Sequence, residues 1–574
     1  MGSTVQSDPA GAVRLSRRQL LRAAAGGAAT TLAVSLLAAC GSNAVGVSSP
    51  VGASKTTSSA KAVQLPAYIP IQGPKPDVPG TAAGIDPAFK TFPKELFKAV
   101  KEPPSKGGEV SIMVWDITTP MSPLGQNPAW QEINKQAGAN IKLTIVPFAD
   151  YNTRLAAVVA GNDLPDALFI PPGNANLQAF GEFLKAKCED LTPYLSGDNI
   201  KAYPNLAGFR TNTWKVTLYN NGIFGVPSQY PIFFWVMWVH KELFDAVSPT
   251  WPTSADDFKK MMQEVTKPSA DVYGIVTETG TGFNVYTGMF PAMFGAPNQW
   301  QVEPGGKLTR TIETEQYKAA VGFARDLYKL GVFTPNSSTN NNVQSKAQFA
   351  QRKAAVRWDG FTAAGAQFWN TAPTLKPPSN IRTVPPFAAD GKSKPLYWFG
   401  SGTFGMTVLK KASPQRIKQL LGIINFIASP FGSEENLLIS YGIKGVDYNL
   451  NAKGNPILTS KGQSDVNPLL WTSGKNPVPV LFNPNFEQFG PTMQADERAM
   501  FPAGTYDPTI PFYSPTNGTK AGTLNQALVD GLDGIVAGRR PLTDFDQLVS
   551  AWRKNGGDQI RAEYQQALQA SGSA

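Results

Sequence analysis

The stretch Glu109–Trp115, with the sequence EVSIMVW, decides the fold of this 574-residue chain. Its apolar run is typical of a buried strand, and a second such run follows at Ile141–Val146. Between them, Trp130–Ala137 has the pattern of a short helix. Beyond them, a helical pattern at Tyr151–Ala160 precedes a third apolar run at Ala167–Ile170. Alternating strands and helices favour a parallel sheet, so the sequence predicts an α/β fold.

An export signal precedes this region. Arg17 and Arg18 stand just before the uncharged run Ala23–Ala39, which is typical of the apolar part of a secretory signal. The arginine pair resembles the twin-arginine export motif, and Leu37–Cys40 resembles the bacterial lipobox, whose cysteine becomes lipidated. We therefore expect Cys40 to anchor the protein by lipid on the outer face of the bacterial cell membrane. The alternative is a short transmembrane helix, for which Ala, Gly and Thr are only mildly apolar.

The length of the chain indicates more than one folded body. Removing a signal peptide of residues 1–39 leaves 535 of 574 residues, and single cores stop growing near about 250–300 residues. Residues 40–107 are rich in Ser, Pro, Gly and Ala, so we expect a flexible tether, of which Ala88–Val100 can fold onto the body. Two large lobes then follow.

Charge and composition exclude several classes of protein. The formal charge of +10 includes a net +3 from the signal peptide, and the remaining Lys and Arg are scattered, so nucleic acid is not an expected partner. A single histidine, His240, and a single cysteine beyond the lipobox, Cys188, are too few for a metal cluster or a disulfide framework. We predict no cofactor and no metal site; no EF-hand loop marks a calcium ion.

Several segments together resemble the extracellular solute-binding proteins of carbohydrate ABC importers. They occur in the family's order and cover roughly residues 108–570. The first group is Ala149–Leu155, Ala160–Ala167, Tyr219–Pro227, Val239–Phe244, Trp251–Phe258, Lys318–Thr334 and Phe349–Val356. A later group, Ser413–Ile417, Asn425–Glu435 and Tyr441–Val446, resembles the lipoprotein branch that binds oligosaccharides. Local signals agree, because Ser254 and Ser413 are both well placed to cap helices.

The resemblance implies a fold of two α/β lobes, of the periplasmic-binding-protein type II kind, with a hinge and a ligand cleft between them. It assigns residues 108–228 and 356–401 to lobe 1, and residues 229–355 and 402–574 to lobe 2, with chain crossings near Pro227, Val356 and Gly402. It also implies a monomeric receptor, not an enzyme, that delivers a carbohydrate to ABC permease subunits.

Aromatic and acidic residues near the expected cleft are the candidate ligand contacts. Sugar rings stack their CH faces on aromatic rings, while their hydroxyl groups bond carboxylates and amides. Trp115 and Asp116 end the first strand, where ligand contact and packing are equally consistent with the sequence. The other candidates lie near the expected crossings: Tyr230, Trp358, Asp359 and Trp398.

Two other functions remain open at this point. A secreted polysaccharide-active enzyme, either a hydrolase or a lyase, needs catalytic groups such as a pair of carboxylates, but no spacing marks a pair and we assign no catalytic residue. A structural surface lipoprotein is the third possibility. The motif Gly400–Gly405 fits G-x-G-x-x-G, yet Met406–Leu409 reads as a strand instead of a helix, so we interpret it as a lobe crossing. His240 and Cys188 are expected to be structural.

Overall fold

The computed structural model describes residues 63–116, 120–161, 163–171, 180–219, 221–468, 470–471 and 479–571. The predicted export signal, with Arg17, Arg18 and Cys40, lies outside these residues, and its role stays a prediction. None of the described helices is both long and apolar enough to cross a membrane. Helices and sheets are both present, which confirms the predicted α/β class.

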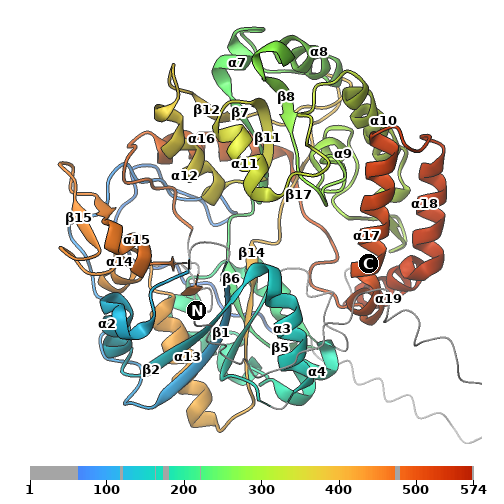
Figure 1. Ribbon diagram of the computed structural model, residues 1–574. Coiled ribbons are helices and arrows are strands. Elements are labelled where there is room, and N and C mark those ends of the chain that lie inside the picture. Colours follow the sequence, from blue (N-terminus) through green and yellow to red (C-terminus); the bar gives the residue numbers. More distant parts are fainter. Residues whose placement is uncertain are drawn as a thin grey trace, which may run out of the picture. The chain divides into compact units, whose positions relative to one another are not determined.

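The first sheet has the strand order β2-β1-β3-β14-β6 (Figure 1). β1 runs parallel to β2 and β3, whereas β14 runs antiparallel to β3 and β6. These pairings confirm the three strands predicted near the start of the body. The strands are β1 (Glu109–Asp116), β2 (Asn140–Pro147), β3 (Ala167–Ile170), β6 (Val226–Gln229) and β14 (Thr403–Leu409).

Helices bury their apolar faces against this sheet and form the first core with it. Ser413 caps one of them by accepting a hydrogen bond from the Arg416 backbone N–H, as predicted, with Pro414 in the first helical position. The helices are α2 (Pro128–Ala137), α3 (Phe148–Ala160), α4 (Phe180–Lys187), α5 (Thr192–Leu195), α6 (Pro204–Ala207), α13 (Pro414–Ile427), α14 (Glu434–Tyr441) and α15 (Ser460–Asp465).

The second sheet has the order β12-β7-β11-β8. β11 runs parallel to β8, and β7 runs antiparallel to its two neighbours, β11 and β12. The strands are β7 (Trp235–His240), β8 (Tyr273–Val276), β11 (Ala354–Gly360) and β12 (Ile381–Thr383). Four two-stranded ladders complete the described strands: β4 (Leu218–Tyr219) with β5 (Gly222–Ile223), β9 (Trp300–Val302) with β10 (Leu308–Arg310), β13 (Tyr397–Trp398) with β17 (Gly504–Thr505), and β15 (Tyr448–Leu450) with β16 (Pro456–Leu458).

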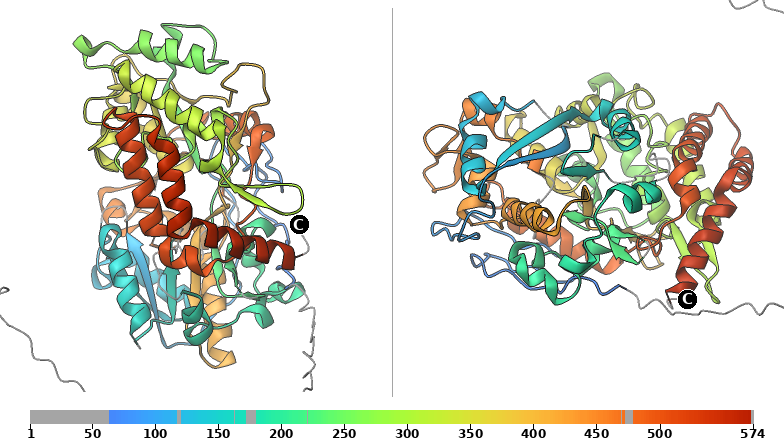
Figure 2. Two further views of the ribbon diagram at one scale, coloured as in Figure 1. Left: turned by 90° about the vertical axis from the view of Figure 1, so that its right-hand side faces the viewer. Right: turned by 90° about the horizontal axis from the view of Figure 1, so that it is seen from below.

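Helices form two cores with the second sheet. Ser254 caps α8 as predicted, accepting from the Asp257 backbone N–H at 3.1 Å. Near the C-terminus, α17 packs against α10, α18 and α19 (Figure 2). The helices are α7 (Lys241–Asp245), α8 (Ala255–Val265), α9 (Met289–Met293), α10 (Glu315–Lys329), α11 (Asn342–Ala350), α12 (Thr362–Thr371), α16 (Phe489–Met500), α17 (Pro515–Val536), α18 (Asp544–Trp552) and α19 (Asp558–Ala570).

Strand pairing corrects the predicted lobe boundaries. Residues 356–401, expected in lobe 1, include most of β11 and all of β12, which belong to the second sheet. Residues 402–471, expected in lobe 2, include β14, and their helices pack in the first core. The chain therefore does not cross at Val356. The apolar run there looked like a returning strand, but it lies between β7 and β8 inside the second sheet.

The N-terminal part of the body corrects a second prediction. Residues 63–107, called the strap below, were expected to belong to a flexible tether of which only Ala88–Val100 folds onto the body, but residues before that segment pack on the body as well. Phe92 is buried, and the Ile69 backbone N–H donates to the Ala207 carbonyl at 2.8 Å. The Pro-rich composition signalled correctly that the strap forms no regular element of its own. It did not reveal that the strap's backbone groups bond to other segments of the body. The rest of the predicted tether, 40–62, lies outside the described residues.

Candidate functional site

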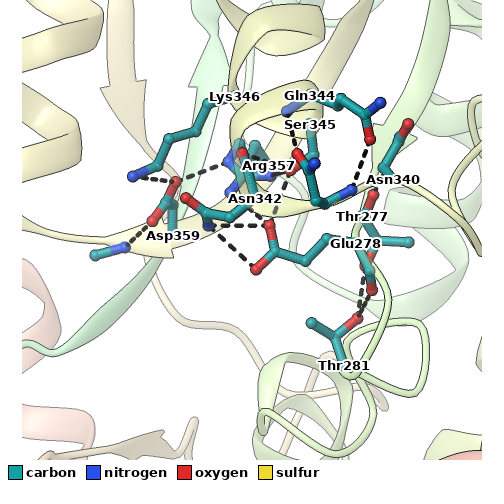
Figure 3. Close-up of polar contacts among 12 residues, drawn as sticks. Thr277, Glu278, Thr281, Asn340, Asn342, Gln344, Ser345, Lys346, Arg357 and Asp359 are labelled. Carbon is teal, nitrogen blue, oxygen red and sulfur yellow. Dashed lines mark hydrogen bonds and ion pairs between the residues drawn. The ribbon is translucent and has the colours of Figure 1, made fainter. Parts of the chain in front are cut away.

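A network of charged side chains lies at one end of the second sheet (Figure 3). Arg357 of β11 is 1% exposed and contacts two carboxylates. Its Nη2 lies 3.0 Å from Glu278 Oε2, and its Nε lies 2.8 Å from Asp359 Oδ2. Lys346 Nζ approaches the same Asp359 oxygen at 3.7 Å. Two cations thus match two carboxylates, and below we call these four residues the polar network.

Helix α11 supplies the neutral partners of the polar network. Ser345 Oγ donates to Glu278 Oε2 at 2.8 Å, and it also bonds Arg357. Asn342 Nδ2 donates to the same carboxylate at 3.0 Å. A capping box formed by Asn341 and Gln344 fixes the start of the helix. The sequence therefore orients the first turn of α11 toward the ends of β8 and β11.

The parallel register of β8 and β11 brings the network together. Val356 and Arg357 pair with Ile275 and Val276, so Glu278, just beyond β8, lies level with the end of β11. In open α/β sheets the ligand crevice lies outside the carboxyl ends of the strands. The polar network occupies that position on the second sheet.

The first sheet presents aromatic rings at its corresponding edge. Phe404 of β14 lies between Trp115 at the end of β1 and Tyr230 just after β6, with ring centroids 5.4 and 5.3 Å apart. Tyr230 continues to Phe234 at 5.3 Å. We call these four residues the aromatic run. Phe148 extends it toward solvent, because its ring is 5.0 Å from Trp115 and the residue is 56% exposed.

The aromatic run meets the polar network at the end of β11. A methyl group built on Gly360 would lie 3.7 Å from the Tyr230 hydroxyl oxygen, and Gly360 directly follows Asp359. The Phe361 backbone N–H donates to the Phe234 carbonyl at 3.2 Å. Tyr230 and Phe234 therefore lie next to the end of β11, the strand that also carries Arg357 and Asp359. Rings and carboxylates grouped at strand ends suit a ligand with apolar faces and hydroxyl groups.

The structure brings together some of the residues predicted from the sequence. Trp115 and Tyr230 belong to the aromatic run, and Asp359 belongs to the polar network. Asp116 is buried beside them at the end of β1 and accepts a hydrogen bond from Asn467 Nδ2 at 3.3 Å.

The other two predicted residues pack on the second core. Trp358 is half-buried and lines a cavity of about 40 Å³ together with Met237 and Val384. Trp398 donates its indole N–H to the Ala296 carbonyl at 2.9 Å. Neither joins the aromatic run among the described ring contacts.

Sequence reasoning missed Arg357, Glu278, Lys346 and Phe404. Arg357 and Asp359 are two residues apart on a strand, so their side chains lie on the same face of the sheet. This spacing could have identified Arg357 as a partner of Asp359 from the sequence. Glu278 follows the end of a short apolar run, but only the β8–β11 register shows which strand lies beside it.

His240 and Cys188 are buried, in line with their predicted structural roles. The His240 ring bonds the Ser379 hydroxyl and the Phe349 carbonyl, and burial lowers its pKa to about 4. Burial raises the pKa of the Cys188 thiol to about 12, which leaves little of the reactive thiolate at neutral pH.

Comparison with known families identifies the family of the chain. Residues 118–430 match the model of the bacterial extracellular solute-binding proteins, which is more than half of the chain. The chain belongs to this family. Its members are binding proteins, and this solute-binding protein carries its polar network and aromatic run at the sheet ends described above.

Individual relatives match over most of their length. The lipoprotein LipO of Bacillus subtilis is 23% identical over 476 residues, which cover 79% of this chain and 91% of LipO. The polygalacturonan/rhamnogalacturonan-binding protein YtcQ of the same organism is 22% identical over 458 residues, covering 77% and 88%. Among solved structures, the N-glycan transport solute-binding protein NgtS of Streptococcus pneumoniae has a TM-score of 0.58 at 14% identity, with 81% and 99% covered. NgtS therefore shares the fold.

Proposed function

We propose that this solute-binding protein is a lipid-anchored receptor that binds a carbohydrate between its two sheets and delivers it to the permease of an ABC importer. One observation carries the proposal: the aromatic run begins at Trp115 of the first sheet and reaches the end of β11 in the second sheet, the strand that carries Arg357 and Asp359 of the polar network. Aromatic faces stack on the CH faces of a sugar ring, and carboxylates accept hydrogen bonds from its hydroxyl groups. In the proposed site Arg357 holds both carboxylates in place.

The relatives support the ligand class. YtcQ is named for binding polygalacturonan and rhamnogalacturonan, and NgtS for transporting N-glycans. These names describe saccharides that differ in charge and branching. We therefore assign a carbohydrate ligand here without choosing between these two kinds of saccharide.

The proposal includes a corrected division into lobes. Lobe 1 takes residues 108–229 and 402–471, and lobe 2 takes residues 230–401 and 480–570. A ligand that contacts both lobes shifts the equilibrium toward their closed arrangement. The size of this shift is set by how much more tightly the ligand binds the closed state than the open state. Export through the Arg17–Arg18 motif and lipidation of Cys40 complete the proposal, with a monomer as the working unit.

A polysaccharide-active enzyme is the less favoured alternative. Glycoside hydrolysis needs a carboxyl group that donates a proton to the leaving oxygen. Glu278 and Asp359 instead both accept hydrogen bonds from Arg357. This arrangement suits the binding of hydroxyl groups.

Calorimetry, scattering and product analysis with a panel of oligosaccharides test the function. We expect one ligand to bind per chain with saturable heat, to reduce the radius of gyration in small-angle X-ray scattering, and to be recovered intact. Release of shorter saccharides would favour the enzyme, and a panel without any bound saccharide would contradict the receptor proposal.

A further inference from the structure

A cavity of about 330 Å³ lies at the carboxyl end of β3. The first sheet contributes Ile170 and Thr403 to its wall, and β4 contributes Tyr219. The opposite wall comes from the C-terminal segment Asp507–Gly518, which includes the start of α17. Segments far apart in the sequence therefore enclose a volume that neither the aromatic run nor the polar network fills.

The cavity adjoins the aromatic run across β14. Thr403 lines the cavity, and the next residue, Phe404, stacks with Tyr230. Successive side chains of a strand point to opposite faces. The backbone comes close here, because Gly405 has φ +128° and a Cβ on it would lie 2.4 Å from the Ile170 carbonyl oxygen. The cavity and the aromatic run therefore lie on opposite sides of the start of β14, at the same end of the first sheet.

The walls of the cavity combine rings with neutral polar groups. The Tyr219 and Tyr513 rings are 4.5 Å apart, and Phe180 meets Tyr219 edge-on at 6.5 Å. Thr509 and Asn517 add a hydroxyl and an amide to the lining. Rings with a few placed hydroxyl and amide groups are the surroundings that a sugar requires.

The same walls disfavour an anion. Among the described residues that line the cavity there is no Lys, Arg or His, while Asp507 contributes a carboxylate. Asp507 Oδ1 accepts from the Thr509 backbone N–H and hydroxyl at 2.9 and 2.7 Å. Burial raises the pKa of the Asp507 carboxyl, and it also raises the pKa of the Tyr219 hydroxyl and that of the Tyr564 hydroxyl. A ligand carboxylate placed here would pay the same desolvation cost beside Asp507.

The cations of the polar network do not make the site more favourable for an anionic ligand. Arg357 is already paired with Glu278 and Asp359, and Lys346 approaches Asp359. An acidic saccharide would have to displace these carboxylates, whereas hydroxyl groups are able to donate to them.

We infer that the cavity is the end pocket of the carbohydrate site, that it holds one uncharged sugar unit, and that the ligands are neutral oligosaccharides. The inference rests on the proposed function. The volume of about 330 Å³ is near the lower end of ligand pockets, about 300–1,000 Å³, so the rest of an oligosaccharide lies along the aromatic run.

A neighbouring cavity is the place where an acidic saccharide, the opposing hypothesis, would bind. It measures about 310 Å³, shares Ser401 and Asp507 with the end pocket, and is lined by Lys215. An acidic saccharide would direct its carboxylate to this lysine. Lys215→Met therefore distinguishes the two ligand classes.

Filling the end pocket tests the inference. Gly518 lies in the first turns of α17, and a Cβ on it would be 3.3 Å from the Tyr513 hydroxyl oxygen. Gly518→Leu places a side chain in the pocket and favours the helix. Thr519→Leu adds the same side chain to the exposed face of the same turn and is the matched control. Asn517→Phe fills the pocket from a second position if Gly518→Leu folds poorly.

The readout is a glycan array with neutral and uronate oligosaccharides, followed by calorimetry. We expect neutral glycans to bind, with affinity at least tenfold lower for Gly518→Leu and unchanged within twofold for Thr519→Leu and Lys215→Met. Unchanged affinity in both pocket-filling variants, or preferred uronate binding that Lys215→Met abolishes, overturns the end pocket while the carbohydrate function stands. An array without any binding by the wild type overturns both.

Discussion

Two clusters in this molecule each combine one buried arginine with two carboxylates. In the polar network, Arg357 contacts Glu278 and Asp359, and Lys346 adds a second cation. The network lies at strand ends beside aromatic rings. In the second cluster, Arg210 pairs with Asp86 of the strap, and the Asp86 backbone N–H bonds Glu497 of α16. The Arg210 backbone N–H donates to the Gln229 side chain at the end of β6.

The charges of the second cluster are balanced differently from those of the polar network. Arg210 Nη2 is 2.8 Å from Asp86 Oδ1, and the Asp86 backbone N–H donates to Glu497 Oε2 at 2.7 Å. Burial raises the pKa of Asp86 to about 6 despite Arg210, and burial together with the Asp86 charge raises the pKa of Glu497 well above its ordinary value. Both shifts favour the protonated acids, so a proton can take the place of the second cation.

The difference teaches that residue types alone do not identify a site. Both clusters contain Arg, Asp or Glu, and both are buried. The strap cluster fastens the N-terminal strap to α16. The polar network instead joins the carboxyl ends of the parallel strands β8 and β11, the position where open α/β sheets bind ligands.

Removing Arg210 should give the largest effect. Arg210→Met leaves Asp86 and Glu497 buried without their cation, and we expect the free energy of unfolding to fall by about 3–5 kcal/mol. Urea unfolding followed by circular dichroism measures the change.

The matched variant is Glu497→Gln, which mimics the protonated acid and keeps an acceptor for the Asp86 N–H. We expect it to cost less than about 1 kcal/mol, on the scale of one neutral hydrogen bond. Equal losses for both variants would show that Glu497 is ionised, and the contrast between the two clusters would disappear.

Removing Arg357 should have a smaller effect on stability and a large one on binding. Arg357→Met leaves Glu278 and Asp359 without their shared partner, and we expect a loss of about 2–3 kcal/mol in stability. Carbohydrate affinity should fall at least tenfold, about 1.4 kcal/mol. Lys259→Met, which removes a surface ion pair with Asp256, is the control for both measurements. Wild-type affinity in Arg357→Met would remove the polar network from the site.

Trp358 tests a prediction made from the sequence. We expect Trp358→Ala to weaken carbohydrate binding by about 1–2 kcal/mol, as for an aromatic anchor at a binding surface. Calorimetry measures the affinity, with Trp398→Phe as a control that keeps the packing on the second core. Unchanged affinity in Trp358→Ala would mean that this ring serves packing alone.

The strap cluster also predicts a modest pH dependence. The pKa of Asp86 is raised in the folded protein, so the folded state holds its proton more tightly than the unfolded state does. This stabilisation is complete below the unfolded pKa near 4 and is lost as the pH rises through about 6. Between pH 5 and 7 we expect the free energy of unfolding to fall by about 1 kcal/mol. Asp86→Asn should flatten this slope, and an equal slope in the variant would contradict the assignment.

The sequence predicted the first sheet better than the chain's course between the sheets. Apolar runs located β1, β2 and β3, and Ser254 and Ser413 were identified as caps, because these signals are local. The strand at Val356 was given to the wrong lobe, since an apolar strand fits the centre of either sheet. The strap was misread because composition reports a lack of regular structure and not the partners of backbone groups.

The prediction of the candidate site was limited in the same way, to signals within one segment of the chain. Trp115, Tyr230 and Asp359 were proposed from the chemistry of sugars and the expected strand ends, and their role as ligand contacts stays a prediction. The Arg357–Glu278 pair joins residues 79 positions apart, and the parallel register of β8 and β11 creates it. Sequence patterns within one segment do not contain that register.

Native mass spectrometry tests the central claim most directly. Wild-type protein and Arg357→Met are incubated with a library of neutral oligosaccharides and transferred gently, so that bound ligand is weighed on the intact chain. The account predicts one saccharide per wild-type chain and none on Arg357→Met, with Lys259→Met behaving as wild type. A saccharide retained equally by Arg357→Met, or a wild-type chain that binds none, would contradict it.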